Sequence, residues 1–289
     1  MKRPVHLLAI DPQNDFCDLP PDYLPIDPVT GRRQAPALAV SGAHRDMQRL
    51  ADLVRAGAAG ITDITVTLDS HHRLDIAHPT FWRAGDGSAV APFTPITATQ
   101  VRAGLYLPRD AASLPRALAY LDELEARGRY TLMVWPVHCE IGSWGHNVHA
   151  DLRAAYNEWE EQQLASVDMV TKGSNPWTEH YSAVQAEVPD AADPDTQLNR
   201  RLIAALDRAE LIVIAGEASS HCVRATTEHV VANLTGRLDR VVLLTDCMSP
   251  VAGFEAEHAA FMTTMQGLGV QLATTDAVLP RLRDNALDR

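Results

Sequence analysis

Long apolar segments are absent from this 289-residue chain. Its longest apolar runs, VHLLAI near the start and LIVIAG near residue 215, have the length of a β-strand, far short of the ~20 residues that a membrane span requires. The opening MKRPVHLLAIDPQNDF has too brief an apolar stretch, and no small-residue cleavage site, for a signal peptide. We therefore expect no membrane association, and we interpret this segment as the first strand of a cytoplasmic protein.

Clusters of cysteine or of basic residues are also lacking. The four cysteines, Cys17, Cys139, Cys222 and Cys247, show neither CxxC nor disulfide-framework spacing, as is typical of a reducing compartment. The chain carries 25 Lys and Arg residues against 37 Asp and Glu residues, a formal net charge of −12, with no basic run. This balance argues against nucleic acid or an anionic membrane surface as a partner, and it leaves a small molecule.

The composition is that of a folded globular protein. With 46% hydrophobic and 21% charged residues, the chain can bury a large core, which excludes disorder as its main state. Its length permits one large domain or two small ones. No linker separates two alternating patterns, so we expect a single domain over 1–289. Insertions are expected near 18–35, 82–107 and 185–195, where Pro, Gly, Thr or acidic residues interrupt the periodic pattern.

Short aliphatic runs alternate with amphipathic segments along most of the chain. The runs that we expect to form strands are 5–10, 64–68, 130–134, 167–171, 211–215 and 241–245. The segments with helical periodicity are 43–55, 198–209, 221–234 and 255–268. Near-continuous apolar strands between helices predict an α/β fold with a parallel sheet that is covered on both faces. Ligands of such sheets bind beyond the carboxyl ends of the strands.

Reactive side chains gather where the expected strands end. Asp11 follows the first strand, Lys172 the fourth, and Cys222 the fifth, at the start of a helix. Backbone N–H groups and the positive dipole at a helix N-terminus lower the pKa of a thiol and can hold an oxyanion. A nucleophile also needs a proton acceptor and a charge partner, which Asp11 and Lys172 at neighbouring strand ends would supply. The alternatives are a buried structural cysteine, an aspartate that caps a turn and a solvated surface lysine.

A second group of polar residues indicates a metal site. Asp69 and His71, two residues apart on a strand, point the same way and can bind one ion, whereas His72 would point the opposite way. With His78 and His138 near adjacent strand ends, one carboxylate and two or three imidazoles suit zinc, iron or manganese, with positions left open. The alternative for each histidine is an ordinary hydrogen-bonded side chain. We interpret three further histidines as solvated or structural: His146, His149 and His180.

Five motifs resemble, in this order, those of the cysteine hydrolases of the isochorismatase-like superfamily, and within it the nicotinamidase/pyrazinamidase branch. They are D-P-Q-N-D-F-C, T-L-D-S-H, W-P-V-H-C, K-G-S-N-P with Y-S-A, and S-H-C-V-R-A-T, and they span 5–275 apart from the three insertions. The resemblance implies a three-layer α/β/α fold with a six-stranded parallel sheet. It also implies an Asp–Lys–Cys triad, which matches Asp11, Lys172 and Cys222.

The resemblance implies further site residues. The metal ligands of the family match Asp69, His71, His138 and, across a loop of different length, His78, with zinc as the expected metal. The aromatic walls of the family's ring pocket match Phe16, Trp135 and Tyr181. The oxyanion hole matches the N–H groups of Cys222 and of Ala218, the latter after a cis peptide.

The sequence also departs from the family pattern. Glu217 stands where an aliphatic residue is usual, and its carboxylate either helps to set substrate preference or forms a structural hydrogen bond. After W-P-V-H-C the usual Gly-containing turn is replaced by E-I-G-S-W-G-H-N, which brings Glu140, Trp144 and His146 there. The 82–107 insertion lies where it would cover the pocket. These differences concern the identity of the substrate more than the chemistry.

We therefore expect a metal-containing cysteine amidohydrolase that cleaves a small carboxamide through a thioester. The resemblance implies nicotinamide, converted to nicotinate and ammonia in pyridine nucleotide salvage. One alternative is an isochorismatase-like hydrolase of another small carbamoyl, ureido or vinyl-ether substrate. Another is a catalytically silent interaction module. A homo-oligomer is compatible with the sequence, which does not specify the oligomeric state.

Overall fold

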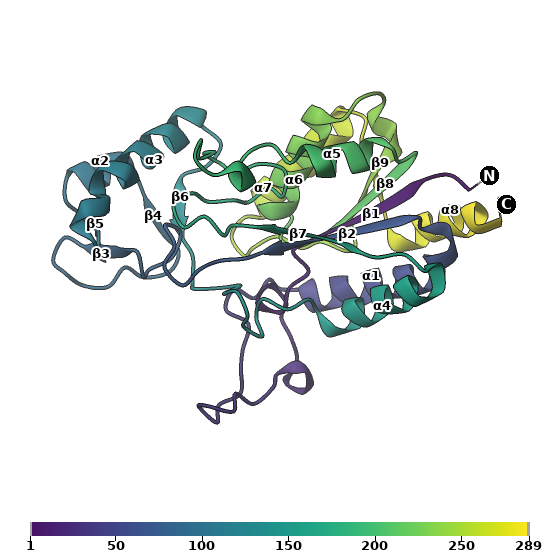
Figure 1. Ribbon diagram of the computed structural model, residues 1–289, viewed down its shortest axis with the longest axis horizontal. Coiled ribbons are helices and arrows are strands. Elements are labelled where there is room, and N and C mark those ends of the chain that lie inside the picture. Colours follow the sequence, from purple (N-terminus) through teal and green to yellow (C-terminus); the bar gives the residue numbers. More distant parts are fainter. Residues whose placement is uncertain (1, 288–289) are drawn as a thin grey trace.

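The computed structural model describes residues 2–287, and a six-stranded sheet lies at its centre (Figure 1). The strand order is β10-β9-β8-β1-β2-β7. The strands are β1 (Val5–Ile10), β2 (Asp63–Asp69), β7 (Asp168–Lys172), β8 (Leu211–Gly216), β9 (Val241–Leu244) and β10 (Gln271–Ala273). All neighbouring strands in it run parallel, which confirms the expected fold class.

The two central strands explain why this sheet forms. Every residue of β1 and β8 is buried, as expected for strands covered by helices on both faces. Their register places Ile10 opposite Gly216, and the register of β2 and β7 places Asp69 opposite Lys172. Ala9 is opposite Val66, so β2 and β7 extend two residues beyond β1 and β8, and the carboxyl ends of all four strands lie at one edge of the sheet.

Helices cover both faces of the sheet and complete three layers (Figure 1). One layer contains α1 (Ala43–Gly57) and α4 (Ala150–Gln163), which pack against each other, and α8 (Thr275–Leu287), which packs against α1. The other layer contains α5 (Arg200–Asp207), α6 (Cys222–Asn233) and α7 (Glu255–Gly267). The apolar face of α1 shows why it forms: Met47, Leu50 and Val54 recur at helical spacing and are fully buried.

The segment between β2 and α4 forms a separate group of short elements, seen at the left of Figure 1. It contains β3 (Trp82–Ala84), β4 (Thr94–Ile96), α2 (Ala98–Arg102), β5 (Tyr106–Pro108), α3 (Leu114–Arg127) and β6 (Leu132–Val134). The 82–107 insertion is thus more ordered than its composition suggested. The 18–35 insertion is an irregular, largely exposed excursion, as expected.

One strand assignment from the sequence is wrong. The run at 130–134 contributes β6, but β6 pairs antiparallel with β4 outside the central sheet. The sixth strand of that sheet is β10, which is short and only partly buried at the sheet edge. Apolar content identifies a strand without identifying its partner, and a half-exposed edge strand lacks the apolar signal altogether. No helix among the described residues is both long and apolar enough to cross a membrane.

Candidate active site

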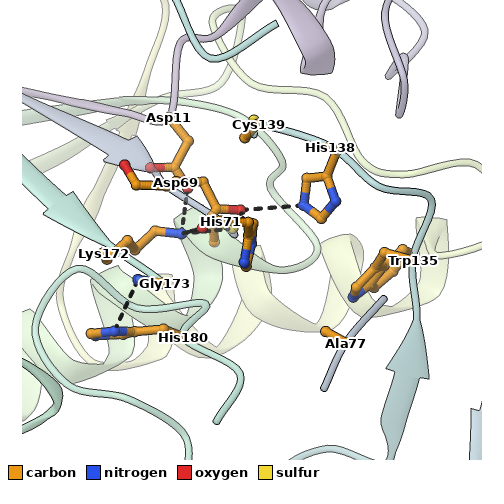
Figure 2. Close-up of polar contacts among 12 residues, drawn as sticks. Asp11, Asp69, His71, Ala77, Trp135, His138, Cys139, Lys172, Gly173 and His180 are labelled. Carbon is orange, nitrogen blue, oxygen red and sulfur yellow. Dashed lines mark hydrogen bonds and ion pairs between the residues drawn. The ribbon is translucent and has the colours of Figure 1, made fainter. Parts of the chain in front are cut away.

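The expected triad comes together at the carboxyl edge of the sheet, where Figure 2 shows Asp11 and Lys172 side by side. The Nζ atom of Lys172 lies 2.8 Å from Oδ2 of Asp11 and 3.7 Å from Sγ of Cys222. The sequence suggested that Asp11 and Lys172 follow neighbouring strands. This expectation is wrong, because β2 lies between β1 and β7. As a result Asp69, at the end of β2, also contacts Lys172, with Nζ and Oδ1 3.0 Å apart.

Burial and charge together set the protonation of the triad. Burial raises the pKa of the Cys222 thiol well above its usual range, although Lys172 opposes this rise. Burial also raises the pKa of Asp11, again against Lys172. Burial lowers the pKa of Lys172, but the charges of Asp11 and Asp69 outweigh it and hold the ammonium form. The resting site therefore holds a lysinium beside a thiol, with the Asp11 carboxyl group in contact with the same lysinium.

Thr67 positions Asp11 and was not identified from the sequence. The N–H of Asp11 donates to Oγ1 of Thr67 over 3.0 Å, and the Thr67 hydroxyl donates back to the Asp11 carboxylate. Asp11 lies just beyond β1 with φ of +44°, so this contact holds a residue in an uncommon backbone conformation. Thr67 is one of the buried residues in the middle of β2, where a threonine looks like any β-branched strand residue.

The turn between β8 and α6 supplies two backbone donors next to the nucleophile. The Glu217–Ala218 peptide is cis, as the family resemblance implies. Among the described residues, no acceptor pairs with the N–H of Ala218 or of Cys222. Both residues line the same cavity, so their N–H groups are available to an oxyanion there.

The four expected metal ligands also converge. The Oδ2 atom of Asp69 lies 3.0 Å from Nε2 of His71 and 3.3 Å from Nε2 of His138. The Nε2 atom of His78 lies 3.3 Å from Nδ1 of His138, and one nitrogen from each of the three histidines lies within 4.8 Å of the others. His72 is exposed and outside this cluster, as expected.

Backbone pairing brings His138 to the end of β2. The N–H of His71 donates to the carbonyl of Cys139 over 3.0 Å, and the N–H of Ile141 donates back to the carbonyl of His71 over 3.0 Å. On the other side, the N–H of Trp135 donates to the carbonyl of Ala77 over 2.7 Å. Trp135 and His138 are thereby placed on one wall of the site, as Figure 2 shows.

The hydrogen bonds of the imidazoles leave a donor set that fits a divalent metal. Nδ1 of His71 lies 3.1 Å from Oδ2 of Asp75, and Nδ1 of His138 lies 2.8 Å from the carbonyl of Pro136. Both acceptors take a proton from Nδ1, so the Nε2 atoms of His71 and His138 are the ones that face Asp69. Burial lowers the pKa of His71, but the charges of Asp69 and Asp75 outweigh it and raise this pKa well above its usual range, so a metal here would displace a proton from Nε2 of His71. Burial lowers the pKa of His78 to about 3, and its buried Nδ1 has no partner among the described residues. One carboxylate and three imidazoles are ligands that suit zinc, iron or manganese.

A narrow, largely apolar cavity opens onto both groups. Phe16, Trp135 and Tyr181, the three expected aromatic walls, line it together with Cys222. The indole N–H of Trp135 donates to the hydroxyl of Tyr181 over 3.0 Å, which fixes these two rings relative to each other. Phe93, from the 82–107 insertion, packs edge-on against Trp135 at 5.8 Å between ring centroids, so that insertion supports the outer wall.

The cavity also contains residues that the sequence analysis did not identify. They are Leu38, Glu179, His221 and Val251. Burial raises the pKa of Glu179 to about 8, so a neutral carboxyl group faces this region at neutral pH. Its Oε2 atom is buried, and residues 2–287 supply no hydrogen-bond partner for it. In the sequence, Glu179 sits in a polar loop two residues before Tyr181, where a glutamate looks like a surface charge.

The residues that depart from the family pattern lie outside the cavity. Glu140 pairs with Arg73 at the surface, and His146 lies 2.8 Å from the hydroxyl of Ser70. Trp144 is half-buried and lines a different hollow. Glu217 is fully buried but does not line the cavity, and its Oε2 accepts the N–H of Ser249 over 3.1 Å. The geometry thus supports the structural alternative for Glu217.

The two remaining histidines that the sequence marked as solvated or structural, His149 and His180, are structural. His149 is fully buried, and burial lowers its pKa to about 4. His180 accepts the N–H of Gly173 at Nδ1 over 3.3 Å, and burial lowers its pKa to about 3 (Figure 2). Both therefore remain neutral at physiological pH.

Comparison with known proteins supports the fold. No protein-family model matches the chain, and no curated protein matches it in sequence. Among solved structures, it is similar to a nicotinamidase/pyrazinamidase of Acinetobacter baumanii, with 18% identity and a TM-score of 0.60 over 96% of this chain and 98% of that one. It is similar to yeast nicotinamidase bound to the inhibitor nicotinaldehyde, with 17% identity and a TM-score of 0.59 over 93% of this chain and 99% of that one.

A third similar structure is the pyrazinamidase of Pyrococcus horikoshii in complex with zinc, with 15% identity and a TM-score of 0.50 over 93% of this chain and 98% of that one. These likenesses confirm the isochorismatase-like α/β/α fold that the motifs implied. The fold is thus that of the nicotinamidase and pyrazinamidase structures.

Proposed function

We propose that this protein is a cysteine amidohydrolase that cleaves a small aromatic carboxamide, with nicotinamide as the substrate. One observation carries the proposal: Lys172 contacts both Asp11 and Cys222 at the end of an aromatic cavity that also adjoins the imidazole cluster. The nicotinamidase and pyrazinamidase structures of the same fold support it, and so does the nicotinaldehyde bound to the yeast protein.

The triad performs the first half of the reaction. Asp11 accepts the proton of the Cys222 thiol as the sulfur attacks the amide carbon. The N–H groups of Ala218 and Cys222 stabilise the oxyanion of the tetrahedral intermediate. Asp11 then returns the proton to the amide nitrogen, the C–N bond breaks, and ammonia leaves a thioester on Cys222.

Water completes the cycle. Asp11, again ionised, accepts a proton from water as the hydroxide attacks the thioester carbonyl, and the same two N–H groups stabilise the second oxyanion. Collapse of this intermediate breaks the C–S bond, and the sulfur recovers the proton from Asp11. Throughout, the Lys172 ammonium stabilises the negative charge that moves between sulfur and carboxylate.

The imidazole cluster would hold a divalent metal through Asp69, His71 and His138, with His78 as a fourth ligand. Zinc is our proposal for its identity, supported by the zinc complex of the Pyrococcus protein, and iron and manganese are the alternatives. A bound metal with an open position supplies a Lewis acid for the ring nitrogen of a pyridine carboxamide. The aromatic walls of Phe16, Trp135 and Tyr181 then orient the ring, and such positioning contributes several kcal/mol to a barrier.

Ammonia release tests the proposal directly. The purified protein is assayed with nicotinamide, pyrazinamide, benzamide and a ureido compound, and its metal content is measured in the same sample. We expect turnover of nicotinamide above that of benzamide, with about one divalent ion per chain. Faster turnover of the ureido compound by a metal-free protein would support the alternative hydrolase. Absence of turnover on every compound would support an interaction module.

A further inference from the structure

Two buried carboxyl groups lie against the turn that carries the oxyanion donors. Glu217 precedes Ala218 in this turn, and Asp46 lies on α1, with side chains 0% and 2% exposed, respectively. Both carboxyl groups accept a hydrogen bond from Ser249, so they lie beside each other. Two adjacent buried carboxyl groups with one arginine as counter-charge do not both ionise. The pair of Glu217 and Asp46 thus carries one negative charge and keeps one proton.

Ser249 joins this carboxyl pair to the turn. Its N–H donates to Oε2 of Glu217 over 3.1 Å, and its hydroxyl donates to Oδ2 of Asp46 over 2.6 Å. Its carbonyl accepts the N–H of Ser219 over 2.9 Å. A second bond runs from the N–H of Val251 to Oγ of Ser220 over 3.1 Å. The turn from Glu217 to Ser220 is therefore held by contacts that start from the carboxyl pair.

The charges around the pair favour one negative charge and oppose a second. Arg49, on α1, is an ion-pair partner of Asp46. Asp18 and Cys17, after β1, and Cys247, after β9, also face the pair. Burial raises the pKa of Glu217 well above its usual range, with Asp46 as the next cause. The state with Asp46 ionised beside Arg49 and Glu217 neutral is therefore the stable one near neutral pH.

We propose that Glu217 is a positioning residue for the oxyanion hole: its protonated carboxyl, bound with Asp46 to Ser249, holds the Ala218 N–H in place. Loss of this proton places two like charges beside one serine inside the protein, and their repulsion displaces the turn. The oxyanion hole then loses its alignment, and the rate of the chemical step falls. This inference rests on the proposed amidohydrolase activity, because the turn matters only if an oxyanion forms there.

Two substitutions separate the proton from the shape of the side chain. Glu217→Gln keeps the shape of the side chain and an acceptor for the N–H of Ser249 but cannot ionise, whereas Glu217→Leu removes that acceptor. The control is Glu187→Gln, because Glu187 is another buried carboxyl, with a pKa that burial raises to about 7, outside this turn. Denaturant unfolding shows whether each variant is folded.

The pH dependence of kcat and KM for the carboxamide gives the main readout. In the unsubstituted protein we expect kcat to fall at high pH with KM unchanged, and in Glu217→Gln we expect this fall to move to higher pH. Glu217→Leu should lower kcat by about 10²-fold at every pH, as expected for a misaligned oxyanion donor, with little change in KM. Glu187→Gln should keep the original profile. A Glu217→Gln profile identical to that of the unsubstituted protein would overturn the proposal.

Infrared difference spectroscopy gives a readout that needs no turnover. Subtracting the spectrum of Glu217→Gln removes the bands of other protonated carboxyls such as Glu179, so the C=O stretch of Glu217 should remain in the difference and disappear as the pH rises. Absence of that difference band would overturn the protonated Glu217 even in an active enzyme. If instead the band titrates but no carboxamide is hydrolysed, the proposed function fails while the carboxyl pair stands.

Discussion

At the scale of single residues, Lys172 links the two halves of the site. Its ammonium lies within 3.0 Å of Asp11, in the triad, and of Asp69, in the imidazole cluster. If Lys172 contacted only one of these two carboxylates, the other would be a buried charge without its lysine partner, which costs several kcal/mol. The same side chain therefore allows a nucleophilic site and a metal site to be adjacent.

The nucleophile is tested by replacing Cys222. Cys222→Ala should lower kcat by several orders of magnitude, because no other group reaches the amide carbon from the start of α6. The fold and the metal content should not change, as checked by circular dichroism and metal analysis. Cys247→Ala, which removes another buried cysteine away from the cavity, should retain turnover. Activity that persists in Cys222→Ala would exclude the thioester mechanism.

The metal site is tested by removing one imidazole. His138→Ala should lower the metal content and weaken metal affinity by at least ~10-fold. Loss of a group that only orients a ligand weakens metal affinity by about 10–100-fold, and loss of a ligand itself should weaken it at least as much. His72→Ala, at an exposed neighbouring histidine, should keep the full metal content. Metal analysis after dialysis against a chelator measures both. Equal metal retention by the two variants would remove His138 from the ligand set.

At the scale of elements, strand register assembles the site. The pairing of Asp69 with Lys172 and of Ile10 with Gly216 means that Asp11 leaves the sheet at the same level as the turn to Cys222. A shift by one residue would turn these side chains toward the opposite face. The strand register alone thus aligns these residues at the sheet edge, and the helices pack over them.

Gly216 is the element-scale test of this alignment. Its φ is +127°, and a Cβ atom there would lie 1.9 Å from the carbonyl oxygen of Ile10, so Gly216→Ala requires β1 and β8 to separate. We expect a loss of more than ~2 kcal/mol in the free energy of unfolding, together with reduced kcat. Gly267→Ala, at the end of α7 with open space around it, should be neutral or stabilising by up to ~1 kcal/mol. Denaturant unfolding compares the two, and equal stabilities would contradict the close approach.

At the scale of the whole molecule, burial sets the charge state of many titratable groups. The histidines with a lowered pKa are His6, His44, His78, His146, His149, His180, His221, His229 and His258. The carboxyl groups with a raised pKa are Asp11, Asp46, Glu179, Glu187 and Glu217. The two sets make stability depend on pH in opposite directions.

We expect the metal-free protein to be most stable near pH 6.5. Below this pH, histidines in the unfolded chain bind protons, whereas folded histidines such as His221 and His229, with pKa values of about 4, stay neutral. Stability therefore falls as the pH falls. Buried Glu179 acts in the opposite direction: from pH 4.5 up to about pH 8 it still holds a proton that the unfolded chain has released, so once the histidine effect ends near pH 6.5, stability falls as the pH rises. Urea unfolding in the presence of a chelator, from pH 5 to 8, measures the curve. Stability that rises steadily to pH 8 would contradict this balance.

The chain itself specifies most of the sheet and most of the site residues. Buried strands such as β1 and β8 are continuous apolar runs, and reactive residues follow them because parallel sheets present their carboxyl ends at one edge. Local patterns of this kind are visible without a structure. The residues that the structure brings together at this edge could therefore be predicted from motif and spacing: Asp11, Lys172 and Cys222, and Asp69, His71, His78 and His138.

Other features depend on contacts between distant segments. The sequence did not predict the pairing of β6 with β4 or the place of β10 in the sheet, because hydrophobicity does not identify a strand's partner. Thr67, Asp75 and Glu179 look ordinary in the sequence, and they become site residues only through what lies beside them. The pairing of Glu217 with Asp46 is the clearest case, because burial of both groups against one serine is a property of tertiary packing alone.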